Sequence, residues 1–281
     1  MKPIFYYDGK LFEPGEPAIP MDDRALFFGD AVYDACLVTN GIPYLLSEHL
    51  DRFYGGCDAL FIRPPMPRDT LDPLLRKLCE AADAEASFLY FQASRSAPTR
   101  RHAAKGTDGS HLLITLTETT APNKSSRAAL RLAKDTRYEY CNINTTNLLP
   151  AVLASTKAAK LGADETVFVR NGYVTECAHS NVSILKNGIL FTHPTDRHIL
   201  PGIARAQLLF TCERLGIPAL ELPFSARTLI EADEIFITST TRICQRANSL
   251  SGKAIGLKDE VRARAIQDML FDDLDNRHYI Q

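Results

Sequence analysis

Residues Glu165 to Ile184 read ETVFVRNGYVTECAHSNVSI, and this stretch says most about the fold. Two apolar runs, 166–170 and 173–176, flank the dipeptide Asn171-Gly172. Asn-Gly between such runs is the strongest short-range signal for a β-hairpin, because both residues tolerate the positive φ of a type I′ turn. The stretch therefore predicts a hairpin, and Asn187-Gly188 predicts a second one shortly after it.

The sequence around these hairpins alternates between strand and helix patterns. Pro201-Gly202 precedes a run of helical period, and the last such run is amphipathic. The expected strands of this part lie at 129–133 and 234–237, and the expected helices at 149–161, 203–215 and 257–274.

The N-terminal part begins with a third predicted hairpin, because Asp8-Gly9 separates the apolar-aromatic runs 4–7 and 10–12. Mixed strands and helices with several hairpins predict an α+β fold rather than a doubly wound sheet. The expected helices of this part lie at 47–60 and 71–84, and the expected strands at 87–93 and 111–116.

The stretch ETTAPNKSS, from Glu118 to Ser126, is polar, contains a proline and interrupts all periodicity. A chain of 281 residues also favours two domains, at about 150 residues per domain. We therefore expect a smaller N-terminal domain over residues 1–118, a linker over 119–126 and a larger C-terminal domain over 127–281.

The composition excludes several classes of function. A net charge of −2 without a long basic stripe argues against nucleic-acid binding. No apolar run approaches the roughly 20 residues that span a bilayer, and the N-terminus MKPIFYYDGKLF lacks the apolar core of a signal peptide. Seven scattered cysteines without a CxxC pair fit a reducing cytosol rather than a disulfide or zinc framework. We expect a soluble cytoplasmic protein.

A series of motifs in a fixed order, together with the stretch 165–184, resembles the fold-type IV (class IV) pyridoxal-phosphate (PLP) aminotransferases. The resemblance covers roughly residues 4 to 250. It implies a two-domain fold with a β-barrel-like C-terminal domain, an amino-acid and a 2-oxo-acid substrate, and a homodimer. The other motifs are Phe28–Tyr33, Glu48–Arg52, His193-Pro194, Leu200–Ile203 and Thr238–Thr241.

The resemblance also implies residues that bind the cofactor, PLP or its amine form pyridoxamine phosphate (PMP). Glu176 would lie at the pyridine nitrogen, where a carboxylate stabilises the protonated ring. Taken alone, Glu176 would be read as a surface glutamate of a hairpin. Ala204 stands where the family often has threonine, which removes a hydroxyl group and keeps the amide. The remaining expected cofactor residues are Arg137 beside Glu176, Leu200 on the ring, and Arg52, Ile203, Ala204, Ser239 and Thr240 at the phosphate.

The segment Pro98 to His102 resembles the Arg-x-His element with which D-amino-acid transaminases hold the substrate carboxylate. Arg100 and His102 are the matching residues, Tyr33 matches the tyrosine that completes this site, and His49 is a supporting candidate. Without the resemblance, the segment reads as a basic solvated loop.

The Schiff-base lysine of the family is missing from its expected position. The segment Cys141 to Pro150, CNINTTNLLP, matches the family without gaps and places Asn144 there. No lysine occurs between Lys134 and Lys157, so a shifted alignment does not recover one. A carboxamide is neither nucleophilic nor basic, and the loss of a positioned general base costs about 10²–10⁴ in rate.

These residues leave three hypotheses. The first is a D-amino-acid transaminase scaffold that holds its cofactor non-covalently and is inactive or strongly impaired because of Asn144. The second is a non-catalytic homologue that binds PLP or PMP. The third is an aminodeoxychorismate lyase-like or branched-chain aminotransferase-like enzyme.

His179 stands where a small residue is expected, and either acts as a weak base or makes structural contacts.

Overall fold

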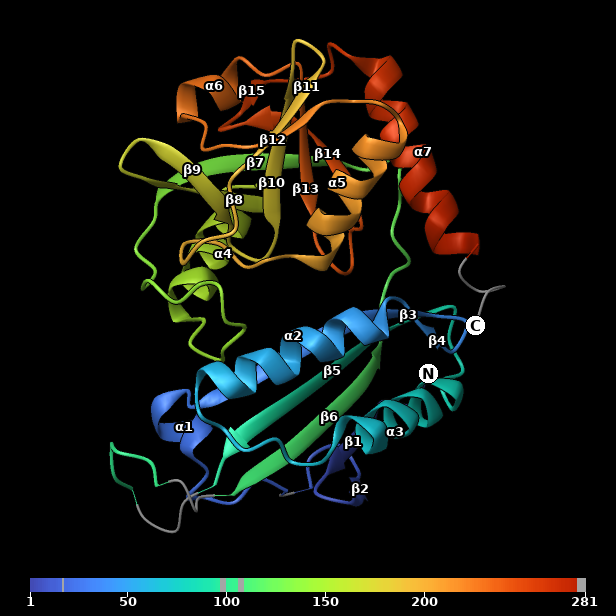
Figure 1. Ribbon diagram of the computed structural model, residues 1–281, viewed down its shortest axis with the longest axis vertical. Coiled ribbons are helices and arrows are strands. Elements are labelled where there is room, and N and C mark those ends of the chain that lie inside the picture. Colours follow the sequence, from blue (N-terminus) through green and yellow to red (C-terminus); the bar gives the residue numbers. More distant parts are fainter. Residues whose placement is uncertain (17, 97–99, 106–108, 277–281) are drawn as a thin grey trace. The chain divides into compact units, whose positions relative to one another are not determined.

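The computed structural model describes residues 1–16, 18–96, 100–105 and 109–276, and the chain divides into two compact units (Figure 1). The N-terminal unit comprises Met1–Ala121 together with Ile143–Asn147. The C-terminal unit comprises Pro122–Asn142 and Leu148–Gln281. Both units combine helices and strands, which confirms the α+β fold class. No described helix is both long enough and apolar enough to span a bilayer.

The N-terminal unit is built on a six-stranded antiparallel sheet with the strand order β2-β1-β6-β5-β3-β4. Three helices accompany this sheet: α1 (Arg24–Phe28), α2 (Leu46–Ala59) and α3 (Arg68–Glu80). The strands are β1 (Ile4–Tyr7), β2 (Lys10–Phe12), β3 (Ala31–Thr39), β4 (Ile42–Pro43), β5 (Ala86–Arg95) and β6 (Ser110–Glu118).

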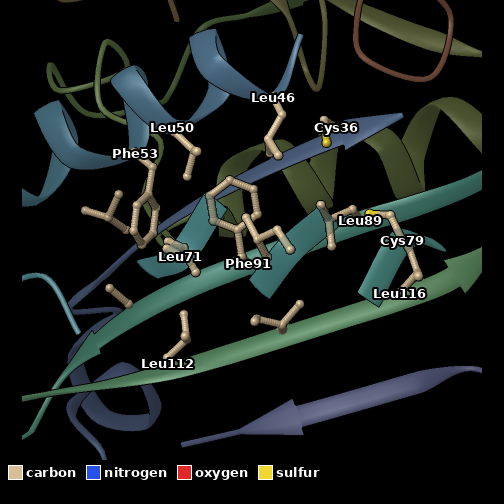
Figure 2. Close-up of a cluster of buried hydrophobic side chains, with 14 of the residues drawn as sticks. Cys36, Leu46, Leu50, Phe53, Leu71, Cys79, Leu89, Phe91, Leu112 and Leu116 are labelled. Atoms are coloured by element: carbon tan, nitrogen blue, oxygen red, sulfur yellow. The ribbon is translucent and has the colours of Figure 1, made fainter. Parts of the chain in front are cut away.

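One apolar core lies between this sheet and the helices α2 and α3. Figure 2 shows Leu50 and Phe53 of α2 and Leu71 of α3 in the same cluster as Phe91 of β5 and Leu112 of β6. Both helices therefore cover the same face of the sheet. Full burial of such side chains contributes roughly 1.5–3 kcal/mol each.

The C-terminal unit is built on a nine-stranded sheet in the order β12-β11-β10-β13-β14-β7-β8-β9, with β15 paired to β14. The strands β7, β8 and β14 pair in parallel. The strands are β7 (Arg127–Lys134), β8 (Glu165–Arg170), β9 (Tyr173–Cys177), β10 (Asn181–Lys186), β11 (Ile189–Thr192), β12 (Ala219–Glu221), β13 (Glu234–Thr238), β14 (Gln245–Leu250) and β15 (Lys253–Ala254). The helices are α4 (Leu149–Lys160), α5 (Ile203–Arg214), α6 (Ala226–Ile230) and α7 (Glu260–Asn276).

This sheet curls, because β9 at one end of the strand order returns to β10 near the other end. The turn between them is closed by a hydrogen bond from the Cys177 amide to the Ser180 carbonyl of 2.7 Å. The curl brings the side chain of Asn181, the first residue of β10, to the carboxylate of Glu176 in β9.

The three predicted hairpins are confirmed, and the expected helices and strands match with shifts of at most four residues at their ends. Asn171 and Gly172 have φ values of 52° and 86°, as the predicted turn requires. The predicted helix at 257–274 begins only at Glu260, because Leu257 has a φ of 59°, outside the helical region. The strands β3 and β14 were not predicted, and neither were the short elements β4, β12, β15, α1 and α6. A charged residue, Asp34, interrupts the apolar pattern of β3 but is fully buried.

Candidate functional site

The carboxylate of Glu176 lies buried near the end of β9 and accepts hydrogen bonds from three groups. Arg137 donates through its guanidinium, and the Asn181 side-chain amide donates to Oε2 at 2.9 Å. The backbone amide of Leu200 donates to the same oxygen at 3.0 Å. The predicted residues Arg137, Glu176 and Leu200 are thus brought together, and the hairpin β8–β9 is the element that positions the carboxylate.

Arg137 donates hydrogen bonds to two carboxylates, those of Asp135 and Glu176. Its Nε donates to Asp135 Oδ1 and its NH2 to Oδ2, both at 3.0 Å, so Asp135 has a bidentate contact. Asp135 also accepts from Thr175 Oγ1 at 3.1 Å. Burial opposes ionisation of Asp135, but the hydrogen bonds and charge of Arg137 outweigh it and lower its pKa to about 2.

Glu176 receives only the remaining NH1 group of Arg137. Burial therefore dominates, and the pKa of Glu176 is raised to about 7 although Arg137, Leu200 and their hydrogen bonds oppose the shift. A buried carboxylate with such a pKa is incompletely compensated. A further positive group, such as a protonated ring nitrogen, would stabilise its charged form.

The start of helix α5 lies directly beside this carboxylate. Asn181 joins the two, because its Nδ2 also donates to the Leu200 carbonyl at 3.0 Å. A Cβ atom at Gly202 would overlap Asn181 Oδ1, so any other residue at this N-cap position would have to displace the Asn181 side chain. The N-cap has no side-chain hydrogen bond, and the first amides of the helix, those of Ile203 and Ala204, lie at its positive end. This geometry suits an anion.

Hydroxyl groups gather at the end of β13, next to Asn181. Thr238 pairs with Asn181 in the sheet, and Ser239 and Thr240 follow directly. Among the described residues, the buried hydroxyl oxygens of Thr238 and Ser239 have no hydrogen-bond partner. An unsatisfied buried hydroxyl costs about 1–3 kcal/mol, so ligand oxygens at this place would remove a penalty.

In the N-terminal unit, Arg52 and His49 both contact Asp34. Arg52 Nε donates to Asp34 Oδ2 at 2.7 Å and its NH2 to Oδ1 at 2.9 Å. The His49 ring nitrogen Nδ1 lies 2.7 Å from Oδ1. Burial alone would raise the pKa of Asp34, but the charge of Arg52 and the hydrogen bonds of both partners lower it.

Asn144 lies in the segment Ile143–Asn147, which belongs to the N-terminal unit. Its carbonyl accepts a hydrogen bond from the Tyr33 amide at 2.9 Å, and Thr145 forms a bridge with Val32. The Tyr33 ring stacks on Tyr90, with centroids 5.2 Å apart. The predicted position Asn144 therefore lies beside Tyr33 of β3, another predicted position.

Arg100 and His102 share one aromatic neighbour, Phe28. The Arg100 guanidinium carbon lies 4.9 Å from the centre of the Phe28 ring, and the His102 ring lies 5.3 Å from it. Both residues are exposed. Pro98 and Thr99, which precede them in the predicted motif, lie outside the described residues.

His179 lies in the turn between Glu176 and Asn181. Its Nδ1 contacts Glu165 Oε2 at 3.0 Å, and its Nε2 lies 3.3 Å from an Arg242 nitrogen. The side chain therefore makes polar contacts of its own in place of a small residue.

The sequence alone did not point to several residues on which these arrangements depend. Asp34 and Asp135 each bind a predicted arginine, and Asn181 links Glu176 to the start of α5. Asn181 stood within the recognised motif, and Asp34 could have been suspected as a carboxylate between apolar strand residues. The partnership of Asp135 and Arg137 carries no comparable sequence signal.

The chain belongs to the class IV aminotransferases, whose family description matches residues 31–250. Members of this family use pyridoxal phosphate. The chain is 33% identical to a D-alanine aminotransferase of Bacillus licheniformis over 262 residues, which cover 91% of this chain and 90% of the relative. A D-alanine aminotransferase of Staphylococcus aureus is 30% identical over 258 residues and 91% of each chain.

Solved structures show the same fold at low identity. The branched-chain aminotransferase of the thermophilic archaeon Thermoproteus uzoniensis, solved with norvaline, superposes with a TM-score of 0.86 at 19% identity, over 95% of this chain and 93% of that one. An enzyme described as a putative 4-amino-4-deoxychorismate lyase, from Legionella pneumophila, superposes with a TM-score of 0.82 at 23% identity, over 92% and 97%.

Proposed function

We propose that this chain is a D-amino-acid transaminase-type protein that holds PLP or PMP without a covalent bond and transfers amino groups poorly, because Asn144 stands at the lysine position. The observation that carries the proposal is the buried Glu176, whose pKa is raised to about 7 and which the Asn181 side chain links to the segment that opens helix α5. The D-alanine aminotransferase relatives support the substrate type.

The residues of the C-terminal unit fit such a cofactor. Glu176 would hold the proton on the ring nitrogen, and Leu200 would pack on the ring. The bound cofactor supplies an electron sink for charge that develops at the substrate α-carbon. The phosphate would take the amides of Ile203 and Ala204 and the hydroxyls of Ser239 and Thr240. Arg52, which Asp34 orients within the N-terminal unit, stays a predicted phosphate ligand.

Asn144 cannot do what a lysine does. Its carboxamide neither attacks a carbonyl group nor accepts a proton at neutral pH. Its carbonyl holds the backbone of Tyr33, a contact that does not depend on the side chain. We infer that the segment keeps its place in the fold and lacks the group that moves the substrate proton.

The substrate carboxylate would be held by Arg100 and His102, with Tyr33 completing the site and His49 acting through Asp34. A guanidinium, an imidazole and a phenol together recognise one carboxylate in one orientation.

We also propose a homodimer. Helix α4 carries exposed apolar side chains on one face: Leu149 is 77% exposed, Val152 55% and Leu153 51%. Contiguous exposed apolar surface of this kind is typical of protein–protein contacts. Light scattering on the purified protein would measure the mass in solution, and a monomer would contradict this part.

A non-catalytic cofactor-binding protein is the second candidate, and Asn144 is the observation that favours it. The two candidates differ in what restoring the lysine does. If the chain retains the rest of the machinery, Asn144→Lys raises the transamination rate by about 10²–10⁴.

The experiment combines mass and rate. The protein is incubated with PLP, treated with borohydride and weighed intact by mass spectrometry, and the amino transfer from D-alanine to 2-oxoglutarate is measured. We expect no covalent cofactor on the natural chain, and a covalent cofactor with a faster rate for Asn144→Lys. Asn142→Lys, two residues away in the sequence, is the matched control and gains neither.

Two results would count against the proposal. A covalent cofactor on the natural chain would show that another lysine replaces the missing one. An Asn144→Lys protein that binds PLP and still transfers no amino group would favour the non-catalytic candidate.

A further inference from the structure

Two buried arginines of the N-terminal unit, Arg24 and Arg95, share the carboxylate of Asp30. Arg24 Nε lies 2.6 Å from Asp30 Oδ2, and Arg95 Nε lies 3.0 Å from the same oxygen. The residues are 4% and 6% exposed, so both need such a partner. What differs between them is where their other nitrogens donate.

Arg24 donates to the backbone of the segment that carries the predicted carboxylate-binding residues. Its NH1 donates to the Arg101 carbonyl, and its NH2 to the His102 carbonyl at 3.1 Å. Only a guanidinium offers two such donors in one rigid plane. Arg24 thereby fixes two successive peptide groups beside Arg100 and His102.

Arg24 also packs on Phe28, the aromatic ring that Arg100 and His102 contact. Its guanidinium carbon lies 4.7 Å from the centre of the Phe28 ring. Arg24 and Phe28 are four residues apart in α1 and so lie on the same helix face. The ring of Phe28 thus contacts Arg24, Arg100 and His102.

Helix α1 is itself anchored to the sheet. The Asp23 side chain caps it, accepting from the Ala25 amide at 2.8 Å, and also accepts from Ser94 Oγ of β5 at 2.6 Å. Asp23 is 2% exposed. A rigid link therefore runs from the core strand through α1 to the segment of Arg100.

We propose that Arg24 is a positioning residue that sets Arg100 and His102 for recognition of a carboxylate on the substrate. The inference rests on the proposed function, which makes those two residues the carboxylate site. A guanidinium that packs its face on an aromatic ring keeps its N–H groups in the plane for a bidentate contact with a carboxylate.

Arg95 provides the matched control. Its NH1 and NH2 donate to the carbonyls of Phe61 and Leu60, both at 2.6 Å, at the end of α2. Loss of either guanidinium removes hydrogen bonds to Asp30, one from Arg24 and two from Arg95, and only the loss of Arg24 releases the segment of Arg100.

The test uses the protein loaded with PMP and measures by calorimetry the affinity for pyruvate and for its amide, which lacks the carboxylate. We expect the natural chain to prefer pyruvate, and Arg100→Ala to lose that preference. Arg24→Lys should lose about tenfold or more of it, the range of a charged hydrogen bond, while Arg95→Lys keeps it. The affinity for PMP, measured separately, should be the same in Arg24→Lys and Arg95→Lys.

Each outcome has its own meaning. A natural chain that does not prefer pyruvate, or an Arg100→Ala protein that keeps the preference, would overturn the proposed carboxylate site. If both behave as expected and Arg24→Lys keeps the full preference, only the role of Arg24 is refuted. Should Arg24→Lys fail to fold, Phe28→Leu replaces it, with an expected loss of about threefold to tenfold. An unchanged preference there would equally refute the role.

Discussion

Two buried carboxylates, Asp34 in the N-terminal unit and Glu176 in the C-terminal unit, each lie against an arginine, and their pKa values shift in opposite directions. Asp34 takes two nitrogens of Arg52 and one of His49, and its pKa is lowered. Glu176 takes one nitrogen of Arg137, whose other two serve Asp135, and its pKa is raised to about 7.

The difference shows that contact with an arginine does not by itself compensate the charge of a buried carboxylate. Asp34 is complete within its unit and acts as a structural anchor for Arg52 and His49. The surroundings of Glu176 compensate its charge only in part, so the charged form would gain from a cationic ligand such as the one proposed. An arginine contacts the carboxylate in both cases, and the two cases differ in how many nitrogens of that arginine the carboxylate receives.

We expect the greatest loss of stability when the contact between Asp34 and Arg52 is removed. Asp34→Asn removes the charge of a fully buried carboxylate that Arg52 and His49 both contact, and we expect a loss of about 3–5 kcal/mol in the free energy of unfolding. Urea unfolding of the cofactor-free protein measures it. Asp51→Asn is the control, because Asp51 of α2 pairs with Arg68 but is 64% exposed, and its loss should cost less than about 1 kcal/mol. Equal losses would mean that Asp34 is no anchor.

The second prediction concerns pH and the incomplete pair. A carboxyl group whose pKa is raised on folding holds its proton longer in the folded state. The free energy of unfolding therefore falls as pH rises from the usual value of 4.5 to about 7, and stays lower above it. The full difference is of the order of 3 kcal/mol for Glu176.

Replacing Glu176 by Gln should remove this fall, which unfolding curves of the cofactor-free protein between about pH 5 and 7 would show. Glu165→Gln is the control, since Glu165 is also fully buried but has a lowered pKa, so its contribution changes only at lower pH. A Glu176→Gln protein with the slope of the natural chain would contradict a raised pKa at Glu176.

The contrast between the two carboxylates also marks what the sequence could reveal. The hairpin that presents Glu176 was predicted from Asn171-Gly172, because turn chemistry is local. The role of Glu176 came from its motif. The division of Arg137 between Asp135 and Glu176 depends on distances between separate strands, which no spacing in the sequence encodes.

In the N-terminal unit, a strand was missed because of a buried charge. Asp34 interrupts the apolar pattern of β3, and a charged residue inside an apolar run argues against a buried strand until its partners are known. Those partners, Arg52 and His49, lie on α2, and both had been singled out for the ligand rather than for Asp34. The sequence did not point to Arg24, since nothing local distinguishes a buried arginine that binds backbone carbonyls from a surface arginine.

Gly202 offers a milder change, because its substitution alters a hydrogen-bond donor of Glu176 and leaves the charge of Glu176 unchanged. In Gly202→Ala the new methyl group overlaps Asn181 Oδ1 and displaces the amide that donates to Glu176. We expect a loss of about 1–3 kcal/mol in the free energy of unfolding and about tenfold in PMP affinity, measured by urea unfolding and calorimetry.

Two further variants test whether this effect runs through Asn181. Gly55→Ala, where a methyl group meets nothing within 4 Å in α2, should stabilise by roughly 0.5–1 kcal/mol instead. Asn181→Ala removes both the atom that the new methyl group would overlap and the amide that donates to Glu176. If Gly202→Ala acts through Asn181, the double variant Gly202→Ala/Asn181→Ala therefore binds PMP as weakly as Asn181→Ala alone. Additive losses would place the effect of Gly202 elsewhere, at the start of α5.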